Sequence, residues 1–381
     1  MLMKNKTNLI FCHKLIKAFA DSLVKLFIPL IILKNSGSLM LVMLYLTSYY
    51  LICGFLNIVL KKFLQKYGII AMILHAFPII AVQFLITTQI TWWLCLIIAV
   101  LGAAGQTLYS VPLNILFAFT DKDVNVAKFQ ISTNVGKLVF IVLSGFVIGS
   151  GLKNSILFLA IAGTVLYLAS IVPIVYGYNL LKDAYEKVAK HPPKIERKTY
   201  RMFNFYHIAF SLVQGVLDTV VPVYLYIENL AFESVAIVMA LIEVCKIGSN
   251  LLAKFMVKHN KSVFSVWISS ACLTVGSVLM MIVKDALVLY ICSCIIAVSF
   301  PLMFVPMFSA FVKKVAAENN QFDGMSYRDV YIAMSRGIMF VPFFVIPSLI
   351  AQFLIGIGGT IAVSFSSTKI LVASHNENDL K

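Results

Sequence analysis

The hydrophobic residues of this chain are gathered into continuous runs of about twenty residues or more, separated by short polar segments. A run of that length crosses the ~30 Å hydrocarbon core of a bilayer as an α-helix. Membrane-spanning strands would instead alternate apolar and polar residues over about ten positions. Hydrophobic residues make up 61% of the chain and charged residues 12%, which is more apolar than the surface of a soluble protein permits. The sequence therefore predicts an all-α membrane protein in a lipid bilayer.

Twelve membrane-spanning helices are expected from these runs. They cover residues 8–33, 39–60, 68–87, 91–118, 128–150, 154–179, 203–227, 232–256, 262–283, 286–312, 328–349 and 350–372. A polar break rich in lysine and arginine, with the pair Pro192-Pro193, separates the sixth run from the seventh. We expect residues 1–180 to form an N-terminal six-helix bundle, residues 181–202 a cytoplasmic basic linker, and residues 203–381 a C-terminal six-helix bundle.

The basic residues of the loops predict the orientation, because cytoplasmic loops of membrane proteins carry an excess of Lys and Arg. With the N-terminus inside, most basic loop residues fall on the cytoplasmic side, and only Lys34, Lys153 and Lys284 fall outside. The inside set is Lys4, Lys6, Lys61, Lys62, Lys66, Lys122, Lys128, the central linker, Lys254, Lys258, Lys261, Lys313, Lys314 and Arg328. We expect a multi-pass protein of the inner or plasma membrane with both termini cytoplasmic. This placement also explains the net charge of +15 without a nucleic-acid partner.

The two halves of the chain resemble each other. The segments KFLQKYG (62–68) and KFMVKHN (254–260) follow the second and eighth runs. Pro29 and Pro222, and Pro112 and Pro306, occupy matching places in LFIPL and TVVPV and in YSVPL and MFVPM. All lie at nearly one offset along the chain. Six helices in each half imply a parallel repeat about an axis normal to the membrane.

In these features the chain resembles the major facilitator superfamily of secondary transporters. The stretch GFLNIVLKKFLQKYG (54–68) is similar to the family motif that joins the second and third helices, although the acidic residue of the motif is absent. SGFVIGSG (144–151) faintly resembles the glycine-rich antiporter motif without its proline. The resemblance implies a monomeric transporter that moves a small-molecule substrate by alternating access, with a proton or a sodium ion as coupling ion.

Charged residues inside the spans are candidates for function, because they are expensive in a membrane. Asp218 has no charged neighbour on its own helix, and it ranks first as a proton carrier since loss of water favours the protonated carboxylic acid. Asp21 and Glu243 follow. Each has a lysine within one helical turn, Lys25 and Lys246 respectively, so a structural ion pair is the alternative.

Lys137 and Arg336 occupy similar depths in the fifth and eleventh spans and have no acid within one turn. Two facing cations would attract an anionic or zwitterionic solute, and arginine can bind a carboxylate or phosphate with two hydrogen bonds. Either cation could instead pair with an acid on another helix. Lys25, Tyr109 and Gln106 complete the predicted substrate site, with helix-packing hydrogen bonds as the alternative for the uncharged pair.

Other polar residues are expected to serve structure. His13, Lys14 and Lys17 would extend to the headgroups, and His75 and His207 would pack. The seven cysteines lie in apolar runs, which argues against a disulfide framework or a zinc site. No cofactor motif, metal-ligand spacing or phosphate-binding loop is present, so no cofactor and no metal are expected. A lipid-modifying intramembrane enzyme and a non-transporting receptor or scaffold are the alternative functions.

Overall fold

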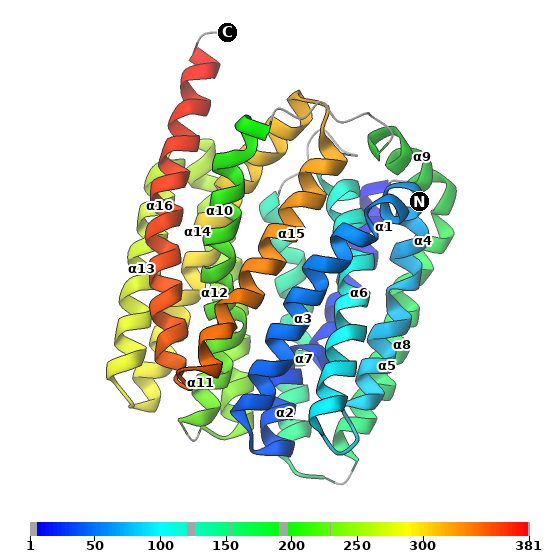
Figure 1. The fold of residues 1–381 in the computed structure, drawn as a ribbon, viewed down its shortest axis with the longest axis vertical. Helices are drawn as coiled ribbons and strands as arrows, with labels where there is room; N and C mark the ends of the chain where they lie inside the picture. Colours follow the sequence, from blue (N-terminus) through cyan, green and yellow to red (C-terminus); the bar gives the residue numbers. More distant parts are fainter. Residues whose placement is uncertain (1–5, 120–125, 153, 190–196, 229, 380–381) are drawn as a thin grey trace.

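The fold is entirely helical over the described part of the chain, which in this computed structural model is residues 6–119, 126–152, 154–189, 197–228 and 230–379. In chain order the elements are α1 (Lys6–Leu23), η2 (Lys25–Phe27), α2 (Ile28–Ser36), α3 (Leu39–Val59), α4 (Lys61–Leu74), α5 (Ala76–Leu85), α6 (Trp92–Phe119), α7 (Val126–Gly149), α8 (Ser155–Tyr176), α9 (Tyr178–Ala189), α10 (Arg197–Gly215), η3 (Val216–Val220), α11 (Val221–Ile227), α12 (Phe232–Lys258), α13 (Ser262–Ile282), α14 (Ala286–Ala317), α15 (Gln321–Phe340), η4 (Val341–Phe344) and α16 (Leu349–Asp379). The helices run side by side along the long axis of the molecule (Figure 1).

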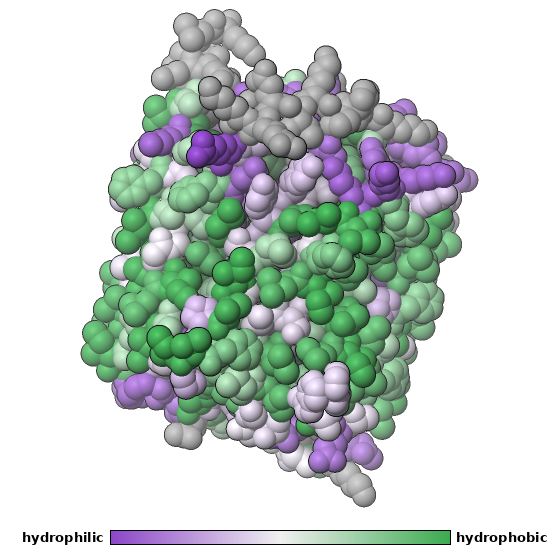
Figure 2. Space-filling view, in the orientation of Figure 1, coloured by the Kyte–Doolittle hydropathy of each residue, from purple (hydrophilic) through white to green (hydrophobic). Residues whose placement is uncertain are grey.

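The surface confirms a membrane protein. Nine helices of the described residues are long and apolar enough to cross a bilayer, and α4 with α5 makes a tenth span bent by 43°. Hydrophobic residues form a band around the visible face, with hydrophilic residues at both ends (Figure 2). The other two predicted spans, α1–α2 and α15, carry several charged residues each. Among them Lys17, Arg328, Asp329 and Arg336 are buried.

The first and seventh predicted spans each depart from α-helical geometry in the middle. Helix α1 passes through the short 3-10 turn η2 into α2, and α10 continues through the π-helical segment η3 into α11. Pro29 and Pro222 lie in the first turn of α2 and of α11. Each of the two matching prolines of the sequence repeat therefore directly follows an irregular helical segment.

The helix contacts also repeat between the two halves of the chain. In the N-terminal half, α1 packs on α7 and α8, α3 on α6, and α5 on α6 and α8. In the C-terminal half, α10 packs on α15 and α16, α12 on α14, and α13 on α14 and α16. Counting the spans in order, each pairing of the first half has its equivalent in the second.

Two close helix pairs join the halves, α3 with α15 and α7 with α12. Glycine permits the second approach, because a Cβ atom placed on Gly145 of α7 would lie 1.9 Å from the Cβ of Ala236 on α12. A Cβ on Gly54 of α3 would likewise lie 2.6 Å from the Met334 side chain of α15. These glycines let two pairs of long helices from opposite halves lie in direct contact.

Several predicted boundaries differ from the structure, and three of them concern the site and the linker. The third span begins at Lys61 and not at residue 68, with the helix kinked at Tyr67. The eleventh begins at Gln321 and not at residue 328, so Arg328 lies inside a helix instead of a loop. The linker contains the helix α9, whose Tyr185 hydroxyl donates to the Leu64 carbonyl at 2.7 Å, because the apolar face of α9 packs under α4.

Part of the topology prediction lies outside the described residues, namely Lys4, Lys122, Lys153, Lys190, Pro192, Pro193 and Lys194. The start of α1, the end of α16 and α9 lie at one end of the molecule (Figure 1).

Candidate functional site

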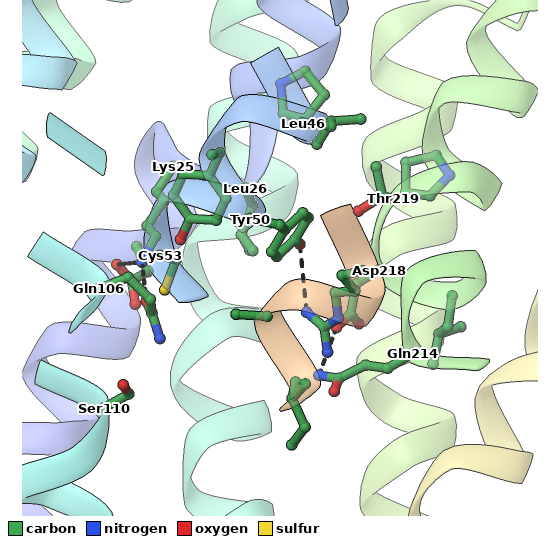
Figure 3. Close-up of a pocket in the computed structure, with 18 of the residues that line it drawn as sticks. Lys25, Leu26, Leu46, Tyr50, Cys53, Gln106, Ser110, Gln214, Asp218 and Thr219 are labelled. Atoms are coloured by element: carbon green, nitrogen blue, oxygen red, sulfur yellow. Dashed lines mark hydrogen bonds and ion pairs between the residues drawn. The ribbon is translucent and has the colours of Figure 1, made fainter. Parts of the chain in front are cut away.

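The spans enclose a central cavity of about 430 Å³ between the two halves. Seven of the eight predicted site residues line it: Asp21, Lys25, Gln106, Lys137, Asp218, Glu243 and Arg336. Figure 3 shows Lys25 and Gln106 on one side of the cavity and Gln214 and Asp218 on the other. The sequence contained these residues on six separate helices, and the fold brings them to one space.

Lys246 of α12 holds the acids of the C-terminal half together. Its Nζ lies 3.0 Å from Glu243 Oε1 and 3.4 Å from Asp218 Oδ1. The Gln214 amide donates to the other oxygen of Asp218 at 2.9 Å. Lys137 approaches Glu243 from the opposite half at 3.8 Å. Asp218, which lacks a cation on its own helix, therefore obtains one from the neighbouring helix.

Asp21 is the centre of a second cluster in the N-terminal half. Its carboxylate accepts from Lys17 at 2.6 Å and from the Tyr167 hydroxyl, and lies 3.8 Å from Lys25. Lys25 in turn donates to Gln106 Oε1 at 3.0 Å. The Lys17 side chain is 4% exposed, so the prediction that Lys17 reaches the headgroups is wrong. The reason is that a carboxylate one turn away neutralises the ammonium inside the protein.

Tyr109 lies apart from the cavity lining, among the side chains behind this cluster. Its ring lies 4.2 Å below Lys17 Nζ and packs against His13 and His75. His13 and His75 donate from Nδ1 to the carbonyls of Ser170 and Met72 at 2.6 and 2.5 Å, since a carbonyl oxygen can only accept.

Both of these histidines are fully buried. The headgroup prediction for His13 is therefore wrong, and the packing prediction for His75 and for the buried His207 is consistent with their burial. A substrate contact for Tyr109 stays a prediction.

Arg336 is the exception among the cavity cations. The guanidinium donates to the Tyr50 hydroxyl at 3.4 Å and lies 5.2 Å from the centre of that ring. Among the described residues no carboxylate lies within 4.0 Å of it, and its Nε has no hydrogen-bond partner. The residue is only 8% exposed, and it lines the cavity.

Arg328 and Asp329 were missed as site residues, because the predicted span began at residue 328 and Arg328 was counted among the basic residues of a cytoplasmic loop. Arg328 Nη1 pairs with Asp329 Oδ1 at 2.8 Å, and Asn114 of the opposite half donates to Asp329 Oδ2 at 3.3 Å. Both charged residues line the cavity. An adjacent basic–acidic pair at the start of an apolar run was the available signal. Tyr50 carried no signal in the sequence.

The cavity has an excess of positive charge when all its side chains are ionised. Five basic residues of the lining, Lys25, Lys137, Lys246, Arg328 and Arg336, face four acidic ones, Asp21, Asp218, Glu243 and Asp329. The excess is located at Arg336, since each of the others has a carboxylate within 4.0 Å. Across the described residues, no group of three or more His, Cys, Asp or Glu side chains is arranged to hold a metal ion.

A bundle of membrane-spanning helices around a central polar cavity defines the class of polytopic transport proteins. The profile of the Major Facilitator Superfamily matches residues 10–327. The chain belongs to this superfamily of membrane transporters.

Solved structures share the fold. A bacterial homologue of the iron transporter ferroportin in an outward-facing state gives a TM-score of 0.71 at 15% identity, over 96% of this chain and 99% of that one. The human organic anion transporter MFSD10 (TETRAN) gives 0.67 at 11% identity, over 96% and 99%. FucP, a transporter of the same superfamily in its outward conformation, gives 0.60 at 14%, over 97% and 99%. A search of curated protein sequences finds no match.

Proposed function

We propose that this protein is a secondary transporter that binds a small anionic or zwitterionic solute in the central cavity. The observation that carries the proposal is Arg336, a buried guanidinium in the cavity wall without a carboxylate partner among the described residues. A buried charge without a counter-charge is costly. A solute that brings a carboxylate or phosphate supplies the counter-charge and can accept two parallel hydrogen bonds from the planar guanidinium.

The route of transport we propose is alternating access between two bundles, residues 1–180 and 203–381, joined by the linker 181–202. The repeated helix contacts support two equivalent units. The solute would bridge the units, because Lys25, Gln106 and Lys137 come from the first, and Arg336 comes from the second. We place both termini in the cytoplasm on the strength of the basic loops, and we expect the monomer to be the working unit.

Coupling to a proton or a sodium ion is proposed at the acids beside Lys246. Asp218 remains the first candidate, because its carboxylate is 32% exposed toward the cavity, whereas that of Glu243 is 6% exposed and receives two cations. As a candidate for ion coupling, Asp21 ranks equal with Glu243, because its carboxylate has three partners, Lys17, Lys25 and Tyr167. We expect Asp218→Asn to abolish uptake driven by a pH gradient while counterflow of the solute continues. Uptake at the wild-type rate in that variant would rule out a proton role for Asp218.

The test of solute binding is the thermal unfolding of purified protein against a library of small metabolites. A ligand that binds the folded state raises the apparent unfolding temperature by mass action. We expect the stabilising compounds to carry an anionic group, and Arg336→Gln to remove the effect. Arg336→Lys should weaken binding without abolishing it, because the ammonium group keeps the positive charge but lacks the two parallel N–H donors of the planar guanidinium.

Two outcomes would contradict the proposal. Stabilisation by anions that is unchanged in a folded Arg336→Gln variant would remove Arg336 from the site. Stabilisation by cations alone would contradict the anionic class. Counterflow of a stabilising compound in liposomes then separates a transporter from a receptor that binds the same compound.

A further inference from the structure

Beyond its charged centre the cavity continues into a second space of about 180 Å³, here called the aromatic chamber. Six side chains line both spaces, so the two are contiguous. These are Asn114, Lys137, Gln214, Asp218, Lys246 and Arg328. Apart from Lys14, the charged residues of the chamber therefore belong to the site described above, but one of its walls has a different chemistry.

That wall is formed by Phe300, Phe304 and Phe308 of α14, spaced four residues apart. The planes of the first two rings differ by 9° and those of the second and third by 15°, with centroids 5.5 and 5.0 Å apart. Phe210 of α10, 1% exposed, packs on Phe300 and Phe304 at 5.3 and 5.7 Å. Rings of the wall are thus held in a fixed, nearly parallel arrangement.

Cations lie at both ends of this wall. Lys246 Nζ is 5.8 Å from the Phe300 centroid, and the Arg328 guanidinium carbon is 4.9 Å from the Phe308 centroid. Arg328 is 9% exposed, and its Nε has no acceptor among the described residues. Leaving a buried donor unsatisfied is unfavourable. An oxygen or ring nitrogen of a molecule in the chamber would satisfy it.

We infer that the aromatic chamber receives a planar ring of the transported solute, which makes the solute class aromatic anions. This inference rests on the proposed function, because the anionic group would bind Arg336. Arg328 and Arg336 are eight residues apart on α15, about 12 Å along the helix axis. A solute that reaches both is elongated, with its anionic group at one end and its ring against the phenylalanine wall at the other.

The experiment compares matched carboxylates as stabilisers of the purified protein. 4-Phenylbutanoate and 4-cyclohexylbutanoate have the same charge, the same spacer and nearly the same size, but only the first has a planar aromatic ring, and 4-(2-naphthyl)butanoate extends the plane. An aromatic pair contributes beyond its buried area, so we expect 4-phenylbutanoate to bind about five times more tightly than 4-cyclohexylbutanoate. We expect 4-(2-naphthyl)butanoate to bind more tightly still.

Phe304→Leu should remove this preference and keep the affinity for 4-cyclohexylbutanoate. Phe311→Leu is the matched control, because Phe311 lies on the same helix, packs on Phe203 and His207, and is absent from the chamber wall. The control variant should keep the preference. Phe300→Leu serves as a second wall variant if Phe304→Leu does not fold.

Equal binding of 4-phenylbutanoate and 4-cyclohexylbutanoate by the wild-type protein would overturn the inference, whatever the variants do. So would a preference that survives both wall substitutions. The two proposals fail differently. If all carboxylates bind through Arg336 without regard to the ring, only the aromatic chamber is wrong. If no carboxylate binds and Arg336→Gln changes nothing, the proposed function itself is wrong.

Discussion

Lys246 offers the sharpest test of the electrostatic structure of the cavity. Its ammonium group is 8% exposed and separates two carboxylates, Glu243 at 3.0 Å and Asp218 at 3.4 Å. Lys246→Gln removes the shared cation and leaves both acids near each other. Breaking a buried pair by deleting one partner costs about 3–5 kcal/mol. We expect the lower end, about 3 kcal/mol, because Glu243 retains Lys137 at 3.8 Å and Asp218 is partly exposed to the cavity.

The expected loss has a simple electrostatic cause. Lys246→Gln leaves two acidic side chains without the cation that lies between them, and like charges at short range repel each other. Thermal unfolding in detergent at pH 8, followed by intrinsic fluorescence, measures the loss of stability relative to the wild-type protein.

The controls separate this effect from the loss of any lysine. Lys182→Gln removes a surface partner of Glu186 at 3.9 Å and should change stability by less than about 1 kcal/mol. The double variant Lys246→Gln, Asp218→Asn should recover part of the loss, since only one acid remains. If Lys246→Gln unfolds at the wild-type temperature at pH 8, or if the double variant is no more stable than Lys246→Gln alone, the assignment of Lys246 as the shared counter-charge is refuted.

Two further predictions concern the packing of the halves and the orientation. Gly145→Val should disrupt the α7–α12 contact, because even a methyl group would lie 1.9 Å from the Cβ of Ala236. We expect the free energy of unfolding to fall by several kcal/mol, or folded protein not to be recovered in detergent. A normal unfolding temperature would show that the two helices can separate freely. A cysteine that replaces the exposed Lys187 of α9 should not react with a membrane-impermeant thiol reagent added outside intact cells. A cysteine that replaces Lys284 should react. The opposite pattern of labelling would show that the proposed topology is inverted.

The sequence predicted the span order because a bilayer requires long apolar runs, and it predicted the candidate charges because charges inside such runs are expensive. Helix starts were harder. Lys61 and Arg328 lie at the polar ends of spans, where hydropathy cannot separate a loop from a helix. The third span was placed seven residues late and the eleventh likewise, because a basic segment and a charged amphipathic turn were assigned to loops.

Ion-pair partners that lie on different helices could not be predicted from the sequence. Asp218 has no cation within a turn of its own helix, but Lys246, on the next span, approaches to 3.4 Å. Lys17 was assigned to the headgroups by its distance from the helix end, yet Asp21 and Tyr167 hold that region of α1 inside the protein. Sequence spacing shows pairs on one helix, whereas only packing shows which helices face each other.

The distribution of ion pairs has a consequence for how the halves can move. Asp21 pairs with lysines of its own half, and Asp218 and Glu243 pair with Lys246 of theirs. Among the described cavity residues, the ion pair that crosses between the halves is Lys137–Glu243, and at 3.8 Å it shares the longest separation in the cavity. Separating the halves at the centre therefore breaks this long ion pair and the hydrogen bonds from Asn114 to Asp329 and from Arg336 to Tyr50. It leaves Lys17, Lys25 and Lys137 with the single acid Asp21 in the N-terminal half. Arg336 has no carboxylate within 4.0 Å among the described residues, so an anion bound there would face the lysines of the opposite half and would add attraction between the halves.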